Sequence, residues 1–205
     1  MYSTRPNIVL GFHGCDESVR DKVVSCKDDL KKSENDYDWL GNGIYFWENN
    51  PERAMDYAKY LKKHSSRAKS KIDKPSVIGA VIDLGYCLDL MDSKYLKLVK
   101  TGYDLLVETH ERFGYTLPSN LPIGQDDELL LRKLDCAVIE TIHQFNKTSN
   151  LRAFDSVRGV FFEGKDLFPN AGFKEKNHIQ ICVRNPNCIK GFFMLRDSDN
   201  SYLIP

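Results

Sequence analysis

Short apolar runs separated by polar, helix-like stretches set the pattern of the first third of the chain. Residues 7–13 (NIVLGFH) form the first apolar run, which predicts a buried strand ending at Gly14. Asp16 is a suitable N-cap for a helix that reaches about residue 27. The charged segment 27–38 that follows predicts a loop. The opening therefore indicates a strand, a helix and a connection.

A second strand and helix follow at residues 41–63. The motif GNGIYF (41–46) predicts a strand. Asn50 followed by Pro51 predicts a helix start, because proline at the first helical position has no needed N–H to lose. Ala54 and Tyr57 then begin an apolar stripe at helical spacing. This stripe predicts that the helix packs one face on the rest of the fold.

The remainder of the chain mixes helices with strands. The expected elements are one or two strands with a glycine kink at 75–90, a helix at 92–113, a Pro/Gly loop at 116–125, a helix at 126–145, and strands at 157–162, 178–183 and 189–195, with a turn at 185–187. Because helices and strands are interspersed rather than strictly alternating, the pattern predicts an α+β fold rather than a doubly wound α/β sheet.

Length and charge narrow the class of protein. A chain of 205 residues can form one domain (1–205), and we expect a helix-rich insertion at about residues 65–150. Its 29 basic and 29 acidic residues balance, so no global charge favours nucleic acid or an anionic membrane. A local basic run at residues 59–74 is most simply a solvated helix end.

Three further absences in the sequence shape the expected location and chemistry. No apolar run is long enough to span a bilayer, and the N-terminus lacks the pattern of a secretory signal. The six cysteines form no C-x-x-C pair, so neither a zinc site nor a disulfide framework is expected. We therefore expect a cytoplasmic protein that holds no metal and does not contact a membrane.

Three separated segments carry residue types suited to ligand binding. In GFHGC, His13 ends the first strand and Gly14 allows close approach of the backbone. In GNGIYF, an aromatic cluster follows two glycines. In HIQICVRN, a strand presents Gln180 among apolar residues, with His178 on the same face by period two. Each segment taken alone also fits ordinary packing. Only the presence of all three in this order points to a ligand site.

Together these motifs resemble the ADP-ribosyltransferase superfamily, in its poly(ADP-ribose) polymerase and diphtheria toxin branch. GNGIYF is similar to that branch's G-K-G-I-Y-F, FHGC to its W-H-G-S, and QICVRN stands in the place of its catalytic-glutamate strand. The resemblance covers roughly the first 60 and the last 50 residues. It implies a split antiparallel sheet and NAD as co-substrate.

The resemblance also implies roles for individual residues. His13 would hydrogen-bond a ribose hydroxyl of the adenosine half, and Gly14 would pair its backbone with the nicotinamide carboxamide. Tyr45 and Tyr57 would stack on the two faces of the nicotinamide ring. Gly43, in the motif's second glycine position, would let the strand pass close to NAD.

The chain differs from the family at the third motif, where the family has a glutamate and this chain has Gln180. Glutamine can keep a hydrogen bond to the ribose but not the negative charge. Three interpretations stay open. Gln180 suffices for slow mono-ADP-ribosyl transfer, or a carboxylate from the preceding loop (Glu163 or Glu175) enters the site, or the domain binds NAD or ADP-ribose without reacting.

The functional expectation is a NAD-dependent mono-ADP-ribosyltransferase resembling toxin or conflict-system members of the superfamily. Its acceptor would be a protein, RNA or DNA, and an antitoxin or other neutralising partner would be implied. The alternative is a catalytically weak or inactive module that binds NAD or ADP-ribose. A Rossmann site is excluded, because G-N-G is not part of G-x-G-x-x-G.

Overall fold

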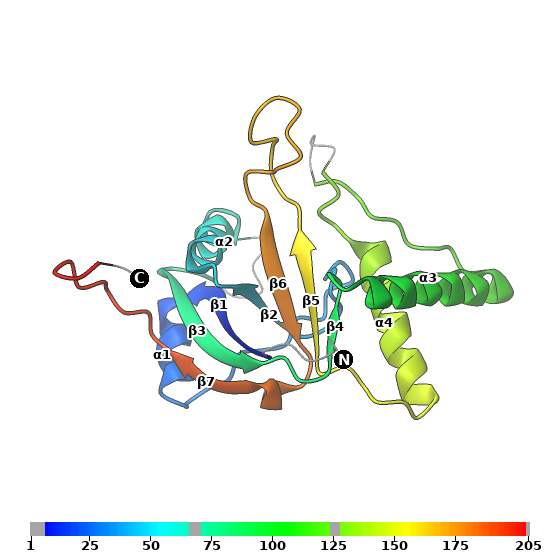
Figure 1. Cartoon of the computed structure of the whole chain (residues 1–205), viewed down its shortest axis with the longest axis horizontal. Coiled ribbons are helices and arrows are strands. Elements are labelled where there is room, and N and C mark those ends of the chain that lie inside the picture. Colours follow the sequence, from blue (N-terminus) through cyan, green and yellow to red (C-terminus); the bar gives the residue numbers. More distant parts are fainter. Residues whose placement is uncertain (1–6, 66–70, 124–127, 204–205) are drawn as a thin grey trace.

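One seven-stranded sheet organises the part of the chain that the computed structural model describes, which is residues 7–65, 71–123 and 128–203. The strand order is β4-β5-β6-β2-β1-β3-β7, and every neighbouring pair is antiparallel except β4–β5. Four α-helices accompany the sheet within these ranges (Figure 1). The α+β class predicted from the sequence is confirmed.

The elements follow the predicted order. The strands are β1 (Ile8–Asp16), β2 (Ile44–Glu48), β3 (Pro75–Asp83), β4 (Cys87–Asp89), β5 (Ser156–Phe161), β6 (His178–Val183) and β7 (Ile189–Phe193). The helices are α1 (Glu17–Val24), α2 (Pro51–Lys63), α3 (Ser93–Phe113) and α4 (Lys133–Thr148), with a short 3-10 turn η2 (Pro186–Cys188) before β7.

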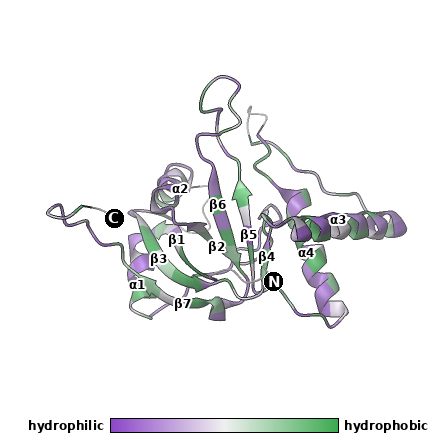
Figure 2. Ribbon diagram, in the orientation of Figure 1, coloured by the Kyte–Doolittle hydropathy of each residue, from purple (hydrophilic) through white to green (hydrophobic). Residues whose placement is uncertain are grey.

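Apolar clusters cover the two faces of the sheet. Phe46, Ile78 and Ile181 point to one face, where α1 and the following loop pack on them. On the other face, two separate clusters form: α2 packs over Phe12 and Trp47, whereas α3 and α4 pack over β5 and the nearby end of β6. Figure 2 shows hydrophobic residues concentrated in the strands, whereas α3 and α4 alternate hydrophobic and hydrophilic stretches. The candidate site described below lies on this second face, between α2 and α4.

The two central strands, β1 and β2, are joined over a short length. Their backbone register pairs are Gly11–Glu48 and Phe12–Trp47, whereas β1 pairs with β3 all the way from Ile8 to Asp16. The strands of the described sheet therefore separate after Phe12, at the H-G motif. Two groups of strands, β3–β7 with β1 and β4–β5–β6 with β2, meet at this narrow joint (Figure 1).

Helix starts are set by side-chain caps, as the sequence indicates. Asp16 accepts a hydrogen bond from the Ser18 N–H at 3.0 Å, and Asn50 accepts one from the Arg53 N–H at 3.0 Å, directly before Pro51. These partners satisfy amide groups that a helix leaves free in its first turn.

The predicted helix at 126–145 is wrong at its start, because α4 begins only at Lys133. Residues 126 and 127 lie outside the described residues. Leu131 instead forms an isolated bridge with Leu121, and Asn120 of the Pro/Gly loop accepts from the Leu134 N–H at 2.9 Å. A loop side chain thus supplies the cap, and periodicity alone extended the helix too far.

The middle of the chain contributes strands to the sheet as well as helices. Strand β3 lies beside β1 in the sheet, and β4 pairs with β5. Helices α3 and α4 pack on each other where Gly102 lies against Ile142, since a Cβ on Gly102 would be 2.6 Å from Ile142 Cγ1. The helical part of the expected insertion is therefore the α3–α4 pair, whereas β3 belongs to the core of the sheet.

Candidate active site

His13 lies where β1 and β2 separate. Its Nδ1 is 2.8 Å from the backbone oxygen of Tyr45, and its ring meets Phe46 edge to face at 5.9 Å. Because a carbonyl only accepts, Nδ1 carries the proton and Nε2 carries a lone pair. Burial lowers the pKa of His13, although the bond to Tyr45 partly opposes this. His13 is thus a neutral imidazole whose Nε2 can accept a hydrogen bond from a hydroxyl group.

Gly14 provides backbone groups beside the same gap. The Leu10 oxygen of β1 accepts a hydrogen bond from the Asn49 N–H, just after β2, at 3.0 Å. In an antiparallel strand, every second residue directs its N–H and C=O toward the same neighbouring strand, so Gly14 faces the same way as Leu10. Gly14 therefore directs its N–H and C=O toward β2, beyond the last register pair at Phe12. A Cβ on Gly14 would lie 2.0 Å from the Ala54 oxygen, so α2 rests directly on the glycine.

Tyr45 ties its own strand to the preceding loop. Its hydroxyl donates to the Gly41 oxygen at 2.8 Å and accepts from the Leu40 N–H at 3.0 Å. The ring packs among apolar residues of the α4 side, and burial raises the pKa of the phenol well above its ordinary value. Tyr45 therefore stays protonated, and its hydroxyl is committed to the loop.

The G-N-G loop is fixed from outside by an ion pair. Glu140 on α4 forms an ion pair with Arg184. Both partners also bind the backbone of Asn42: Glu140 accepts a hydrogen bond from its N–H at 2.8 Å, and Arg184 donates one to its oxygen at 2.9 Å. Gly41 has a φ of +78°, and a Cβ there would lie 2.4 Å from Glu140 Oε1. Only glycine fits this left-handed position beside the carboxylate.

Gly43 has a packing role in the same loop. A Cβ on Gly43 would lie 2.5 Å from Cys182 Sγ. Its N–H and C=O bond to the backbone of Ser33 at 3.0 and 2.8 Å. The backbone groups of Gly43 are therefore already paired, and what this residue offers to the site is close contact between the loop and β6.

Gln180 lies on β6, opposite Trp47 of β2 and Gly159 of β5. Paired residues in an antiparallel sheet point to the same face, so Gln180 shares the α2 side of the sheet with Trp47. Trp39 Nε1 donates to Gln180 Oε1 at 2.6 Å. A Cβ on Gly159 would be 2.8 Å from Trp39 Cη2, so the indole lies directly over this glycine.

Aromatic rings surround Gln180 on this face. Trp47 contacts Tyr57 with ring centroids 5.1 Å apart and His178 at 6.1 Å. Phe161 contacts Trp39 at 5.1 Å and His178 at 5.6 Å. Tyr57, which the resemblance places across the nicotinamide ring from Tyr45, has its own ring against that of Trp47. We call the six residues Trp39, Trp47, Tyr57, Phe161, His178 and Gln180 the aromatic patch.

Two buried polar atoms in the aromatic patch have no protein partner among the described residues: Trp47 Nε1, a donor, and His178 Nε2. His178 Nδ1 donates to the Lys176 oxygen at 2.6 Å, so its Nε2 is an acceptor, and burial lowers the pKa of His178. One donor and one acceptor left unpaired in the same region are what a water or a ligand hydroxyl would satisfy.

Glu163, the candidate acid of the preceding loop, lies beside the aromatic patch. Arg53 of α2 donates to its carboxylate at 2.8 Å, and Lys176 pairs with it at 3.7 Å. The charges of Arg53 and Glu163 both act on His178. Glu175 is exposed, and its N–H bonds to the Lys165 oxygen in the β5–β6 connection. Of the two candidate acids, Glu163 is therefore the one with contacts that reach the patch.

The fold thus joins most of the residues singled out from the sequence. His13 and Tyr45 meet at the separation of β1 and β2, and Gln180, Tyr57 and Glu163 group around Trp47. The motifs in the sequence did not mark Trp39, Trp47 or Arg53 as residues of the site. Arg53 could have been found, because it precedes Tyr57 by one helical turn on the same face of α2.

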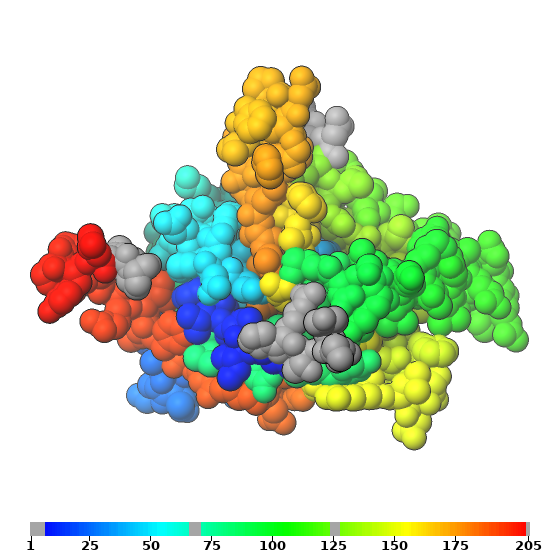
Figure 3. Space-filling model, in the orientation of Figure 1, coloured from blue at the N-terminus to red at the C-terminus, as the bar shows by residue number. Residues whose placement is uncertain are grey.

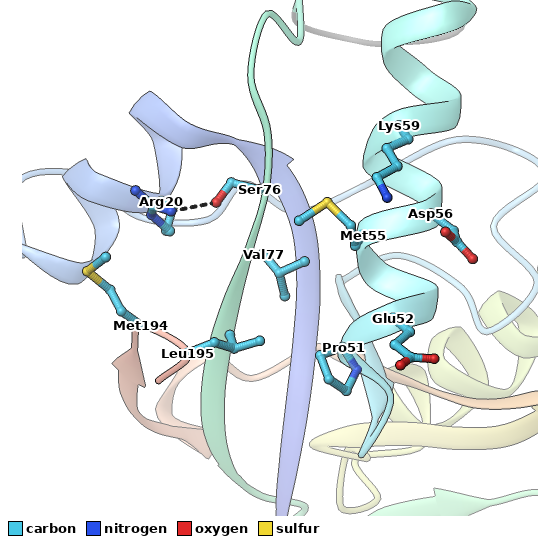
Figure 4. Close-up of a pocket in the computed structure, with 10 residues that line it drawn as sticks. All are labelled: Arg20, Pro51, Glu52, Met55, Asp56, Lys59, Ser76, Val77, Met194 and Leu195. Carbon is cyan, nitrogen blue, oxygen red and sulfur yellow. Dashed lines mark hydrogen bonds between the residues drawn. The ribbon is translucent and has the colours of Figure 1, made fainter. Parts of the chain in front are cut away.

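A separate hollow lies on the other flank of α2. This cavity of about 540 Å³ is lined by the apolar residues Met55, Val77, Met194 and Leu195 and by charged residues of α2, namely Glu52, Asp56 and Lys59 (Figure 4). At its end, Arg20 donates to Ser76 at 2.8 Å. None of the predicted site residues lines this cavity, so it is distinct from the aromatic patch.

A pH-dependent effect on stability is expected at His143, beside the Glu140–Arg184 pair. Burial and the charge of Arg184 lower the pKa of His143 from 6.5 to about 4. The unfolded chain then binds a proton more readily than the folded one, so His143 lowers the free energy of unfolding as the pH falls from about 6.5 to about 4, by roughly 3 kcal/mol in all.

Denaturant unfolding of wild type and His143→Asn at pH 7.5, 5.5 and 4.5 measures this effect. We expect the free energy of unfolding of the wild type to fall more steeply toward acid than that of His143→Asn. Parallel curves for the two proteins would contradict the assigned pKa shift.

Comparisons with known proteins leave the family open. No protein-family model matches the chain, and no solved structure matches it. The chain is similar to the uncharacterized protein MJ0359 of Methanocaldococcus jannaschii, with 28% identity over 198 residues that cover 87% of this chain and 83% of the relative. In the described ranges, no helix has the length and apolarity to cross a bilayer, and no group of three His, Cys, Asp or Glu residues is placed to hold a metal ion.

Proposed function

We propose that this protein is a NAD-dependent mono-ADP-ribosyltransferase with a split sheet of the poly(ADP-ribose) polymerase and diphtheria toxin type. The observation that supports this most strongly is the convergence of the three sequence motifs. His13 Nδ1 is 2.8 Å from the Tyr45 backbone, and Gln180 lies on the strand next to Tyr45, in register with Trp47. The separation of β1 and β2 beside these residues supports the split.

The site chemistry suits NAD. The neutral Nε2 of His13 would accept from a ribose hydroxyl, and the Gly14 peptide groups would pair with the carboxamide. The aromatic patch, with Tyr57 41% exposed at its edge, offers a stacking surface for the nicotinamide ring. These residues would hold NAD while its bond between C1′ of the ribose and nicotinamide breaks.

The transfer itself would pass through an oxocarbenium-like state at C1′, as in glycoside cleavage. The nucleophilic atom of the acceptor forms a bond to C1′ and loses its proton, and nicotinamide leaves with the bonding electron pair. Glu163 is a carboxylate next to His178 that could take the proton of the acceptor, once released from Arg53. We propose a protein or nucleic-acid acceptor and a toxin-like or conflict-system role.

A binding module for NAD or ADP-ribose is the second candidate. It is favoured by the contact between Gln180 Oε1 and Trp39 Nε1, because the oxygen that would replace the family's carboxylate is already bonded. The same residues would then hold the ligand, with no charge placed to stabilise a cation at C1′. Losing a preorganised charge of this kind costs about 2–4 kcal/mol in a transition state.

The test incubates the protein with NAD labelled in its ADP-ribose half and with separate pools of protein, RNA and DNA. We expect label on one pool and release of nicotinamide. Gln180→Ala should lower the rate more than NAD affinity, whereas Gln180→Glu should raise the rate if the missing charge limits catalysis.

The outcomes separate the candidates. NAD binding by calorimetry without nicotinamide release would leave the binding module and exclude the transferase. Absence of both binding and release would remove NAD from the proposal altogether. An unchanged rate in Gln180→Ala would show that the third motif has been placed wrongly.

A further inference from the structure

The side-chain amide of Gln180 has a defined orientation in this structure. Trp39 Nε1 can only donate, so the Gln180 atom 2.6 Å from it must be the amide oxygen. The oxygen and nitrogen of a glutamine side chain are often hard to tell apart, but here the donor-only indole identifies the oxygen. Gln180 Nε2 consequently points away from Trp39, and among the described residues the side chain of Gln180 is hydrogen-bonded to Trp39 through its oxygen alone.

The indole of Trp39 is itself held in place. It lies over Gly159, where any side chain would collide with it, and its ring meets Phe161 at 5.1 Å. The guanidinium of Arg132 lies 5.8 Å from the Trp39 ring and 5.5 Å from the Phe161 ring. Cation–π contacts of this kind and the packing restrict rotation of the indole. Trp39 is therefore a fixed donor rather than a mobile loop side chain.

We propose that Trp39 is a positioning residue that fixes the Gln180 amide so that the site presents a hydrogen-bond donor, Nε2, to an acceptor oxygen of the nicotinamide ribose. A glutamate at this position would instead present an acceptor to a ribose hydroxyl. The kinetic part of this inference rests on the proposed function, but the orientation of the amide does not.

The orientation has a direct spectroscopic test, because the chain contains only two tryptophans. An ¹⁵N-labelled full chain gives two indole N–H signals, assigned with Trp39→Phe and Trp47→Phe. In Gln180→Ala, we expect the Trp39 indole proton to move upfield and to exchange with solvent at least tenfold faster. In Gln180→Glu, it should stay hydrogen-bonded, because a carboxylate also accepts. An unchanged Trp39 signal in Gln180→Ala would overturn the proposal.

The presentation of a donor is tested by adding NAD to the same labelled protein. The Gln180 side-chain NH₂ pair, identified by its loss in Gln180→Glu, should shift as NAD binds. If NAD binds and this pair does not move, Gln180 does not donate to the ligand and the proposal is wrong.

Kinetics then test positioning. Phenylalanine at position 39 keeps a ring over Gly159 but removes the N–H. We expect Trp39→Phe to lower kcat for nicotinamide release about fivefold, the worth of one neutral hydrogen bond, with KM for NAD changed less than twofold. In a Gln180→Ala background, the same change should have no further effect.

Equal losses in both backgrounds would show that Trp39 acts through packing and would contradict the proposal. If the wild type neither binds NAD nor releases nicotinamide, the proposed function fails, and the indole signals still decide whether Trp39 orients Gln180.

Discussion

Gly14→Ala is expected to lower the midpoint of thermal unfolding by about 6–12 °C, which corresponds to a loss of about 3 kcal/mol in a chain of this size. The added Cβ would lie 2.0 Å from the Ala54 oxygen, 3.0 Å from the Ala54 carbonyl carbon and 3.3 Å from Ala58 Cβ. Two of these three atoms belong to the backbone of α2, which cannot swing aside as a flexible side chain does. The helix must lift from β1, and the contact of Tyr57 with Trp47 must change with it.

A matched control is available in the same sheet. A Cβ on Gly191 of β7 would meet no atom within 4 Å. Gly191→Ala should therefore change the free energy of unfolding by no more than about 0.5 kcal/mol. Calorimetry of the three proteins compares the two sites. A Gly14→Ala protein that melts like Gly191→Ala would mean that α2 does not rest on the H-G motif.

The second large effect is expected on NAD affinity. Tyr57→Ala should weaken NAD binding by roughly 5- to 30-fold, because it removes one stacking surface worth about 1–2 kcal/mol. Tyr57 is 41% exposed, and its ring is supported by Trp47, so folding should be largely retained. The same change at Tyr45 would be harder to interpret, since its hydroxyl also holds the G-N-G loop.

Tyr60→Ala is the control for this experiment. Tyr60 lies on the same helix and is 37% exposed, but its ring lies against His64, with centroids 4.3 Å apart. Calorimetric titration with NAD should give wild-type affinity for Tyr60→Ala and a clear loss for Tyr57→Ala. Equal affinities for the two variants would exclude Tyr57 from the proposed NAD site.

Local signals in the sequence account for much of the fold. Caps at Asp16 and Asn50 and the kink at Gly85 each depend on neighbouring residues. The start of α4 was missed because its cap comes from Asn120, a side chain of the preceding loop. A periodic pattern does not reveal a partner that only the folded chain brings near.

The candidate site could be outlined from the sequence only where motifs mark it. His13, Gly14 and Tyr45 were singled out through their motifs, and Gln180 through its strand. The partners that orient these residues were not recognisable, since the Trp39–Gln180 and Glu140–Arg184 contacts join distant parts of the chain. Arg158 likewise pairs with residues of two other strands, Glu48 of β2 and Asp89 of β4.

The distance along the chain between the two halves of the site matters for protein synthesis. Trp39 and Gln180 are 141 residues apart, and β6 lies between β2 and β5 in the sheet. A ribosome releases His13, Tyr45 and Tyr57 long before β6 exists. Until that strand emerges and inserts, the nascent chain has neither the Gln180 amide nor the strand that joins β2 to β5. Any activity of this site therefore begins only after the chain has been made as far as the end of β6 at Val183.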